Sequence, residues 1–141
     1  MRIVIVGGVA AGMSAAARAR RLDESAEIIV LERGEHVSFA NCGLPYYVGG
    51  EIEQQSSLLV QTPASLRAAL NLDVRVNTEA VGLDAGAKIL TLRTAAGEER
   101  LEYDALILAP GAFALHPPIA GLDSPRVHTL RTVADAVTLW Q

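Results

Sequence analysis

Residues 4–12 read VIVGGVAAG, an apolar run that breaks at two glycines and leads into small residues. The run from Arg2 to Val6 is short and rich in β-branched residues, which predicts a buried strand. The stretch from Ala11 to about Leu22 is rich in Ala and Arg and predicts a helix. Glu27 to Leu31 predicts a second buried strand. The chain therefore begins with a β-α-β unit, whose parallel strands we expect to be joined by a right-handed crossover.

The glycine turn between this strand and helix is typical of a dinucleotide-binding site. Gly7 would allow the tight turn, and Gly12 would let the helix pack closely on the sheet. The backbone N–H groups at the start of the helix would then face a pyrophosphate. Val9 occupies the position where the second glycine usually stands. By itself, the turn is equally compatible with a cofactor site and with a purely structural junction.

Glu32 strengthens the interpretation as a cofactor site. It lies about 20 residues past Gly12, at the end of the second strand, where a carboxylate accepts hydrogen bonds from a ribose diol. The alternative is a surface acid that happens to follow a buried strand. Together the two features favour an adenine dinucleotide, and they do not distinguish FAD from NAD.

The rest of the chain predicts further helices and strands, with no obvious linker between domains. A helix N-cap is expected at Thr62, and Pro45 is compatible with the first turn of a helix. The expected elements are a short helix at 42–49, a helix at Pro63–Leu70, a β-meander of Val74–Leu83, Ile89–Thr94 and Arg100–Tyr103, a buried strand at Asp104–Ala109, a loop at 116–125 and a helix at Val133–Trp140.

Composition narrows the class of protein. The 141 residues are 50% hydrophobic and 20% charged, as expected of one globular domain of ordinary size. A net charge of −4 without a basic cluster argues against nucleic-acid binding. No apolar run reaches the roughly 18–20 residues of a membrane span, and glycine comes too early for a secretory signal. We therefore expect a cytoplasmic protein with no membrane contact, no nucleic-acid partner and no metal site.

Three segments carry a more specific resemblance: GGVAAGMSAAARARRLDE (7–24), LERGEHVSFANCGLPYYVGG (31–50) and YDALILAPGA (103–112). In this order they resemble the pyridine nucleotide-disulfide oxidoreductases. The likeness is to the single-cysteine branch: FAD-dependent coenzyme A-disulfide reductases and the related NADH oxidases, peroxidases and persulfide reductases.

The resemblance implies an α/β, Rossmann-like FAD-binding domain with a three-layer ββα architecture, in which the layers are a β-meander, a parallel sheet and crossover helices. A pure nicotinamide domain would alternate strands and helices, so the meander also favours FAD. Residues 1–141 would form an incomplete first part of this domain. The NAD(P)-binding and dimerization domains of a full-length homodimer would lie outside these residues.

The resemblance also implies site residues. YDALILAPGA matches a second flavin fingerprint, and LRTVADA matches a further flavin contact. The expected cofactor contacts are Gly7, Gly8, Val9, Ala10, Ala11, Gly12, Glu32, Arg33, Val81, Ala109, Pro110, Gly111 and Arg131. The expected contacts to coenzyme A are Ser14, Arg18, Arg21, Ser38 and Asn41. Arg18 and Arg21 are spaced to share one helical face. The other interpretation of this basic stretch is a solvated helix end.

Cys42 is the only cysteine, so no internal disulfide can store electrons. A lone redox cysteine forms a mixed disulfide with a substrate thiol or cycles through sulfenic acid. At the start of a short helix, the helix dipole favours the thiolate, which is the nucleophile toward disulfides. An isolated cysteine is otherwise a buried, inert residue.

The expected activity transfers electrons from the co-substrate NAD(P)H to FAD, then to Cys42, and then to a disulfide, persulfide or polysulfide. Coenzyme A disulfide is the favoured substrate. One alternative is an NADH oxidase or peroxidase, although Ala10 stands where those enzymes carry a histidine. The other is a non-catalytic nucleotide-binding domain with a structural Cys42. The choice between NADH and NADPH stays open.

Overall fold

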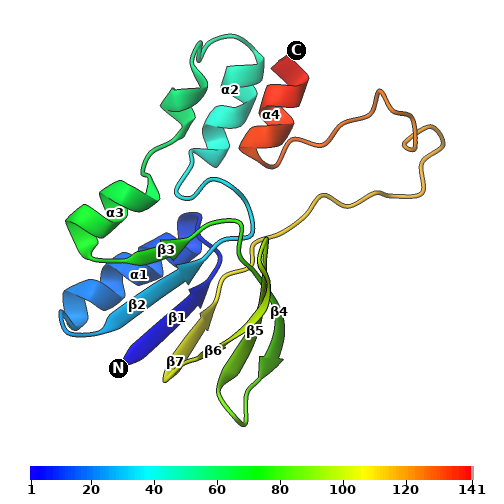
Figure 1. Cartoon of the computed structure of the whole chain (residues 1–141). Coiled ribbons are helices and arrows are strands. Elements are labelled where there is room, and N and C mark those ends of the chain that lie inside the picture. Colours follow the sequence, from blue (N-terminus) through cyan, green and yellow to red (C-terminus); the bar gives the residue numbers. More distant parts are fainter. Residues whose placement is uncertain (141) are drawn as a thin grey trace. The chain divides into compact units, whose positions relative to one another are not determined.

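Strand β1 (Arg2–Val6) lies in the interior of a four-stranded sheet with the order β3-β2-β1-β7 (Figure 1). Its neighbours are β2 (Glu27–Leu31) and β7 (Ala105–Leu108), and β3 (Asp73–Arg75) pairs with β2. All three pairings are parallel. The central strands are covered on both faces, which is why they appear in the sequence as unbroken apolar runs.

Helices α1 (Ala10–Leu22) and α3 (Pro63–Leu70) cover one face of this sheet. The core on that side joins Met13 of α1 and Leu66 of α3 to Ile5 and other strand residues. Burial of these apolar side chains drives the packing of the helices onto the sheet.

A second sheet covers the opposite face (Figure 1). It is antiparallel, with the order β4-β5-β6, and consists of β4 (Glu79–Asp84), β5 (Ile89–Thr94) and β6 (Gly97–Glu102). Leu90 and Leu92 of β5 pack against Val4 and Ile29 of the parallel sheet. The helix, parallel-sheet and meander layers confirm the predicted α/β fold class.

The prediction of one strand over 74–83 is wrong. β3 ends at Arg75 and pairs with β2, whereas β4 begins at Glu79 and pairs with β5. Between them Asn77 has a φ of +50°, a left-handed conformation that Asn tolerates better than most residues. This residue redirects the chain from one sheet to the other. The last meander strand also begins earlier than expected, at Gly97.

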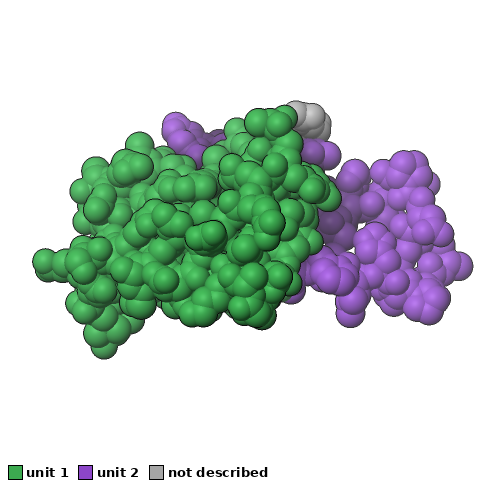
Figure 2. All heavy atoms as spheres, turned by 60° about the horizontal axis from the view of Figure 1, so that its bottom comes forward, with its two compact units in different colours: residues 1–38, 61–111 green, residues 39–60, 112–141 purple. Residues whose placement is uncertain are grey.

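The structure is a computed structural model that describes residues 1–140, and the chain divides into two compact units (Figure 2). Unit 1 contains residues 1–38 and 61–111, which hold both sheets, α1 and α3. Unit 2 contains residues 39–60 and the chain from Ala112 onward. Each unit has its own core and is described by itself. Within residues 1–140, no helix has both the length and the apolar character needed to cross a bilayer.

Unit 2 is a small helical assembly. It contains two short 3₁₀ helices, η1 (Asn41–Gly43) and η2 (Gln55–Leu58), and two α-helices, α2 (Leu44–Val48) and α4 (Val133–Trp140). The core between them contains Leu44, Tyr47, Leu58, Val133 and Ala136. The rings of Tyr47 and Trp140 stack with their centroids 5.1 Å apart. This stack joins the end of α4 to α2, the helix that directly follows Cys42.

Candidate functional site

The glycine turn follows β1 and is crowded by backbone on two sides. Gly7 has a φ of +104°, and a Cβ there would overlap the carbonyl oxygen of Ala109, at the end of β7. A Cβ on Gly12 would overlap the carbonyl oxygen of Gly7. The turn, the first turn of α1 and the end of β7 thus meet at backbone distance, which only glycine permits.

The start of α1 is open to an anion. The helix begins at Ala10 after Val9, no side chain caps it, and its first turn contains no acidic residue. Ala10 and Ala11 are exposed. The uncapped N–H groups and the positive end of the helix dipole are suited to a pyrophosphate.

The carboxylate of Glu32 is fixed beside this turn. Its Oε2 accepts a hydrogen bond from the Gly8 N–H at 2.9 Å, and its Oε1 accepts one from the Gly34 N–H at 2.8 Å. A Cβ on Gly8 would press on a Val37 methyl group and on the Glu32 side chain. Each carboxylate oxygen can accept more than one hydrogen bond, so Glu32 keeps acceptor capacity for ribose hydroxyls.

A pocket of about 110 Å³ lies at the carboxyl ends of β1 and β2. Four residues predicted to contact the cofactor line it: Gly7, Glu32, Arg33 and Pro110. Ligands of open α/β sheets bind at the carboxyl ends of the strands. The residues described so far fit the adenosine and pyrophosphate parts of a dinucleotide.

One wall of this pocket consists of residues that the sequence did not predict. Val81 was expected near the adenine, but the wall is formed by Thr78, Glu79 and Ala80. Thr78 is buried, and its N–H donates to the carbonyl of Glu32 at 2.9 Å. In the sequence, Thr78 looks like any β-branched strand residue, so nothing there signals this contact.

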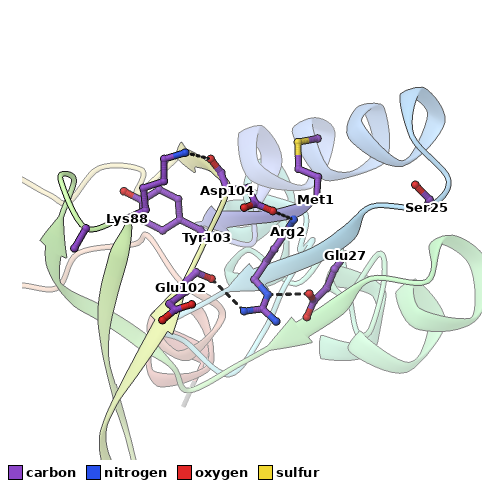
Figure 3. Close-up of a pocket in the computed structure, with 9 residues that line it drawn as sticks. Met1, Arg2, Ser25, Glu27, Lys88, Glu102, Tyr103 and Asp104 are labelled. Atoms are coloured by element: carbon purple, nitrogen blue, oxygen red, sulfur yellow. Dashed lines mark hydrogen bonds and ion pairs between the residues drawn. The ribbon is translucent and has the colours of Figure 1, made fainter.

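A larger pocket of about 450 Å³ lies at the opposite, amino ends of β1 and β2 (Figure 3). Arg2 forms an ion pair with Glu27 at 2.8 Å, its backbone N–H donates to the Asp104 carboxylate at 2.6 Å, and Lys88 donates to the backbone carbonyl of Asp104 at 3.1 Å. The hydrogen bond to Glu27 raises the pKa of Arg2. No predicted site residue lines this pocket, so we place the candidate site at the smaller one.

Cys42 lies in η1 of unit 2, directly before α2, and is exposed. The backbone around it is well anchored, because Ala40 N–H donates to Leu58 O and Gly43 N–H donates to Ala40 O. Gly43 is buried, and a Cβ there would press on Leu58. The turn thus holds its apolar side in the core and leaves the thiol open to a reactant.

Two other predicted residues accompany Cys42 in unit 2. Arg131 Nε donates to the carbonyl of Ala112 at 3.1 Å. With its carboxamide oxygen turned toward Arg131, Asn41 accepts from Arg131 Nη1 at 3.2 Å and donates to Phe39 O at 3.0 Å. Asn41 and Arg131 were predicted for different ligands, and the structure brings them together.

The remaining predicted residues belong to unit 1. Ser14, Arg18 and Arg21 are exposed. Their spacing places them on one side of α1. Ser38 has a φ of +48°, and its N–H donates to Gly8 O at 2.9 Å. Gly111 is exposed, with a φ of +74°. Over residues 1–140 there is no group of three or more His, Cys, Asp or Glu that could hold a metal ion.

The family model for "pyridine nucleotide-disulphide oxidoreductase" matches residues 1–141. The chain belongs to this family. Oxidoreductases of the family use FAD and NAD(P)H, which agrees with the resemblance recognised in the sequence.

Curated relatives of the family resemble the chain over nearly all of its length. Coenzyme A disulfide reductase of Staphylococcus haemolyticus is 35% identical over 136 residues, which cover 95% of this chain and 30% of the relative. An NADH oxidase of Methanocaldococcus jannaschii is 31% identical, covering 96% of this chain and 30% of the relative. The chain thus spans under a third of the length of these relatives.

Solved structures also resemble the chain over nearly all of its length. The reduced CoADR-RHD of Bacillus anthracis superposes with a TM-score of 0.94 at 46% identity, covering 99% of this chain and 26% of the other. A NAD-dependent persulfide reductase from A. fulgidus superposes with a TM-score of 0.92 at 39% identity, with the same coverage.

Proposed function

We propose that this chain binds FAD at the glycine turn and that Cys42 is the redox thiol of an NAD(P)H-dependent flavoprotein disulfide reductase. The favoured substrate is coenzyme A disulfide, with a related persulfide or polysulfide as the next class. The full-length protein would be a cytoplasmic homodimer. The exposed Cys42 thiol, on a turn anchored by buried neighbours, carries the redox part of the proposal.

Support for FAD comes from the hydrogen-bond donors and acceptors at the carboxyl ends of the parallel strands. The uncapped start of α1 would hold the pyrophosphate, and Glu32 would accept hydrogen bonds from the ribose. The pocket beside Glu32 offers room at the position of an adenosine. Pro110 lines this pocket, and Ala109 crowds Gly7, so the end of β7 would contact the same cofactor.

The chemistry of Cys42 follows from thiol–disulfide exchange. FAD, when bound, supplies a two-electron carrier between a nicotinamide and a thiol. The Cys42 thiolate attacks one sulfur of the substrate, forms a mixed disulfide and releases the first thiolate. Two electrons from NAD(P)H then break the mixed disulfide, release the second thiol and restore Cys42. Each disulfide consumes one NAD(P)H and one proton and yields two thiols.

The substrate proposal draws on the exposed side of α1 and on the relatives. Ser14, Arg18 and Arg21 present a hydroxyl and two guanidinium groups along one side of the helix. Arginine binds phosphate oxygens well, and coenzyme A carries phosphates as well as a thiol. Relatives described as coenzyme A disulfide reductases favour the same class.

The redox role of Cys42 is tested in the full-length protein with Cys42→Ser. We expect the variant to retain its flavin and to lose at least about a hundredfold of its NAD(P)H-dependent coenzyme A disulfide reduction, because serine is a far weaker nucleophile than a thiolate. NAD(P)H absorbance reports turnover, and protein-bound flavin absorbance reports the cofactor. A variant with unchanged turnover would remove Cys42 from the reaction.

The cofactor site is tested with Glu32→Gln against Glu35→Gln, a nearby exposed acid. A charge-assisted hydrogen bond contributes about 1.5–3 kcal/mol, so Glu32→Gln should weaken FAD binding by about tenfold or more. Glu35→Gln should bind FAD as the unaltered protein does. Flavin retained after gel filtration measures both, and circular dichroism checks that each variant is folded. Equal retention would exclude Glu32 as a ribose ligand.

An NADH oxidase is the second candidate, supported by the likeness to the Methanocaldococcus protein. The two activities differ in their electron acceptor. An oxygen electrode with NADH and no disulfide distinguishes them: rapid oxygen uptake favours the oxidase, and uptake far below the rate of disulfide reduction favours the reductase.

A further inference from the structure

We propose that Arg131 is a positioning residue for the Cys42 turn, which it holds through the side chain of Asn41. The inference rests on the proposed redox role of Cys42 and adds to it a specific device. Arg131 was expected to contact the flavin. Its guanidinium also has protein partners within unit 2, and these contact the turn that carries Cys42.

One planar group connects two chain segments. Arg131 Nε donates to Ala112 O at 3.1 Å, and with the Asn41 amide in the orientation that satisfies both of its groups, Arg131 Nη1 donates to Asn41 Oδ1 at 3.2 Å. Asn41 in turn donates to Phe39 O at 3.0 Å, across the start of the turn. Because the five N–H groups of arginine lie in a fixed fork, binding at two of them sets the orientation of Asn41, the residue before Cys42.

Arg131 is itself held at the start of α4. Its backbone N–H donates to Asp135 Oδ2 at 2.9 Å, and the Thr132 N–H donates to the same oxygen at 2.8 Å. Helix α4 packs on α2, the helix that follows Cys42, through the shared core and the stack of Tyr47 with Trp140. The thiol is therefore held from both sides in the chain. Arg131 fixes Asn41, the residue before Cys42, and the packing of α4 fixes α2, the helix after it.

This arrangement limits the directions in which the exposed thiol points. Disulfide exchange requires the attacking sulfur to approach the substrate disulfide in line, so a loose turn lowers the rate of the chemical step more than it lowers substrate binding. We call the contacts of Arg131 with Ala112 and Asn41 the clamp. The clamp uses Nε and Nη1, so it is compatible with an additional cofactor contact through Nη2. The two roles make different predictions for Arg131→Lys.

The first measurement reads the clamp directly. Lysine keeps the charge of Arg131 but cannot present two N–H groups in a fixed fork. In the full-length protein, Arg131→Lys should therefore raise amide hydrogen exchange over residues 40–43 by about tenfold, because this turn opens more easily. Arg126→Lys, an exposed arginine of the same connecting segment, is the matched control and should leave that exchange unchanged. Unchanged exchange in Arg131→Lys overturns the proposal.

The second measurement reads the consequence for catalysis. We expect Arg131→Lys to lower kcat for disulfide reduction about tenfold, with KM for the disulfide nearly unchanged and the flavin retained. In an Asn41→Ala background the same substitution should have less than about a twofold effect, because the two residues act as one unit. Additive effects overturn the role of Asn41, and loss of flavin as the sole defect assigns Arg131 to the cofactor instead. If the unaltered protein reduces no disulfide, the proposed function fails, while the exchange data still decide the clamp.

Discussion

At the scale of single residues, the glycines of the first turn are fixed by backbone neighbours. A Cβ on Gly12 would overlap the carbonyl oxygen of Gly7, and a Cβ on Gly7 would overlap that of Ala109. A flexible side chain can rotate away from an intruding methyl group, but a backbone carbonyl directly after a strand cannot move without shifting the end of that strand. Both positions therefore connect local sequence to the spacing of β1, α1 and β7.

We predict that Gly12→Ala destabilises the chain by about 1–3 kcal/mol, the usual cost of overpacking, despite the higher helix propensity of alanine. Urea unfolding followed by far-UV circular dichroism measures the free energy of unfolding. Gly86→Ala is the control, because its Cβ would make only ordinary van der Waals contact with Asp84 at 3.5 Å. If both variants unfolded at the same urea concentration, the close approach of α1 to the turn would be refuted.

At the scale of elements, the sequence correctly predicted those helices and strands that are marked by local features such as an apolar run or a capping residue. The strands Arg2–Val6 and Glu27–Leu31 and the helix Val133–Trp140 have the expected bounds. The helix Pro63–Leu70 does too, and its predicted cap at Thr62 is confirmed, because Thr62 Oγ1 accepts from the Ser65 N–H.

The sequence failed where partners distant in the chain decide the structure. The run from Val74 to Leu83 looks like one strand, but its first part pairs with β2 and its last part with β5. The same limit applies to the site. Gly7 and Glu32 were predicted because turn chemistry is local, whereas Thr78 enters the pocket only through long-range folding.

The start of α4 gives a pH-dependent prediction. Burial raises the pKa of Asp135, but hydrogen bonds from the Thr132 and Arg131 N–H groups and from the Thr132 hydroxyl outweigh it, and the pKa falls below the ordinary value of 3.8. A lowered pKa in the folded state stabilises the fold above pH 3.8. That stabilisation is lost as the pH falls further, through the pKa of the folded state.

We therefore expect Asp135→Asn to destabilise α4 by about 1 kcal/mol at pH 7, a typical value for a lost cap. The difference from the unaltered chain should shrink as the pH falls below 3.8. The fluorescence of Trp140, the only tryptophan, reports the unfolding of this region. Asp123→Asn, at an exposed acid of the preceding segment, is the control and should follow the unaltered chain. A difference that stays constant down to pH 2 would rule out the cap as its cause.

At the scale of the whole molecule, stability is distributed unevenly along the chain. Each unit has its own buried cluster, whereas residues 109–132 contain no helix or strand. The segment carries large exposed apolar side chains, among them Phe113 and Leu115. Its backbone hydrogen bonds between residues 117 and 127 all join near neighbours in the chain. Segments of this kind open with little free energy.

We predict that trypsin first cuts after Arg126, because a protease needs several residues of extended chain around the bond. The arginines of α1 are poor competitors because their backbone is helical. Arg20 also donates to the carbonyls of Asp23, Glu24, Leu70 and Asn71. Arg131 is engaged by Ala112, so it should be cut later than Arg126. Limited digestion with mass spectrometry should give residues 1–126 first, and Arg126→Gln should slow the first cleavage by about tenfold. First cleavage inside α1 would contradict this order, because the helix would then open more readily than a segment whose hydrogen bonds between residues 117 and 127 join near neighbours in the chain.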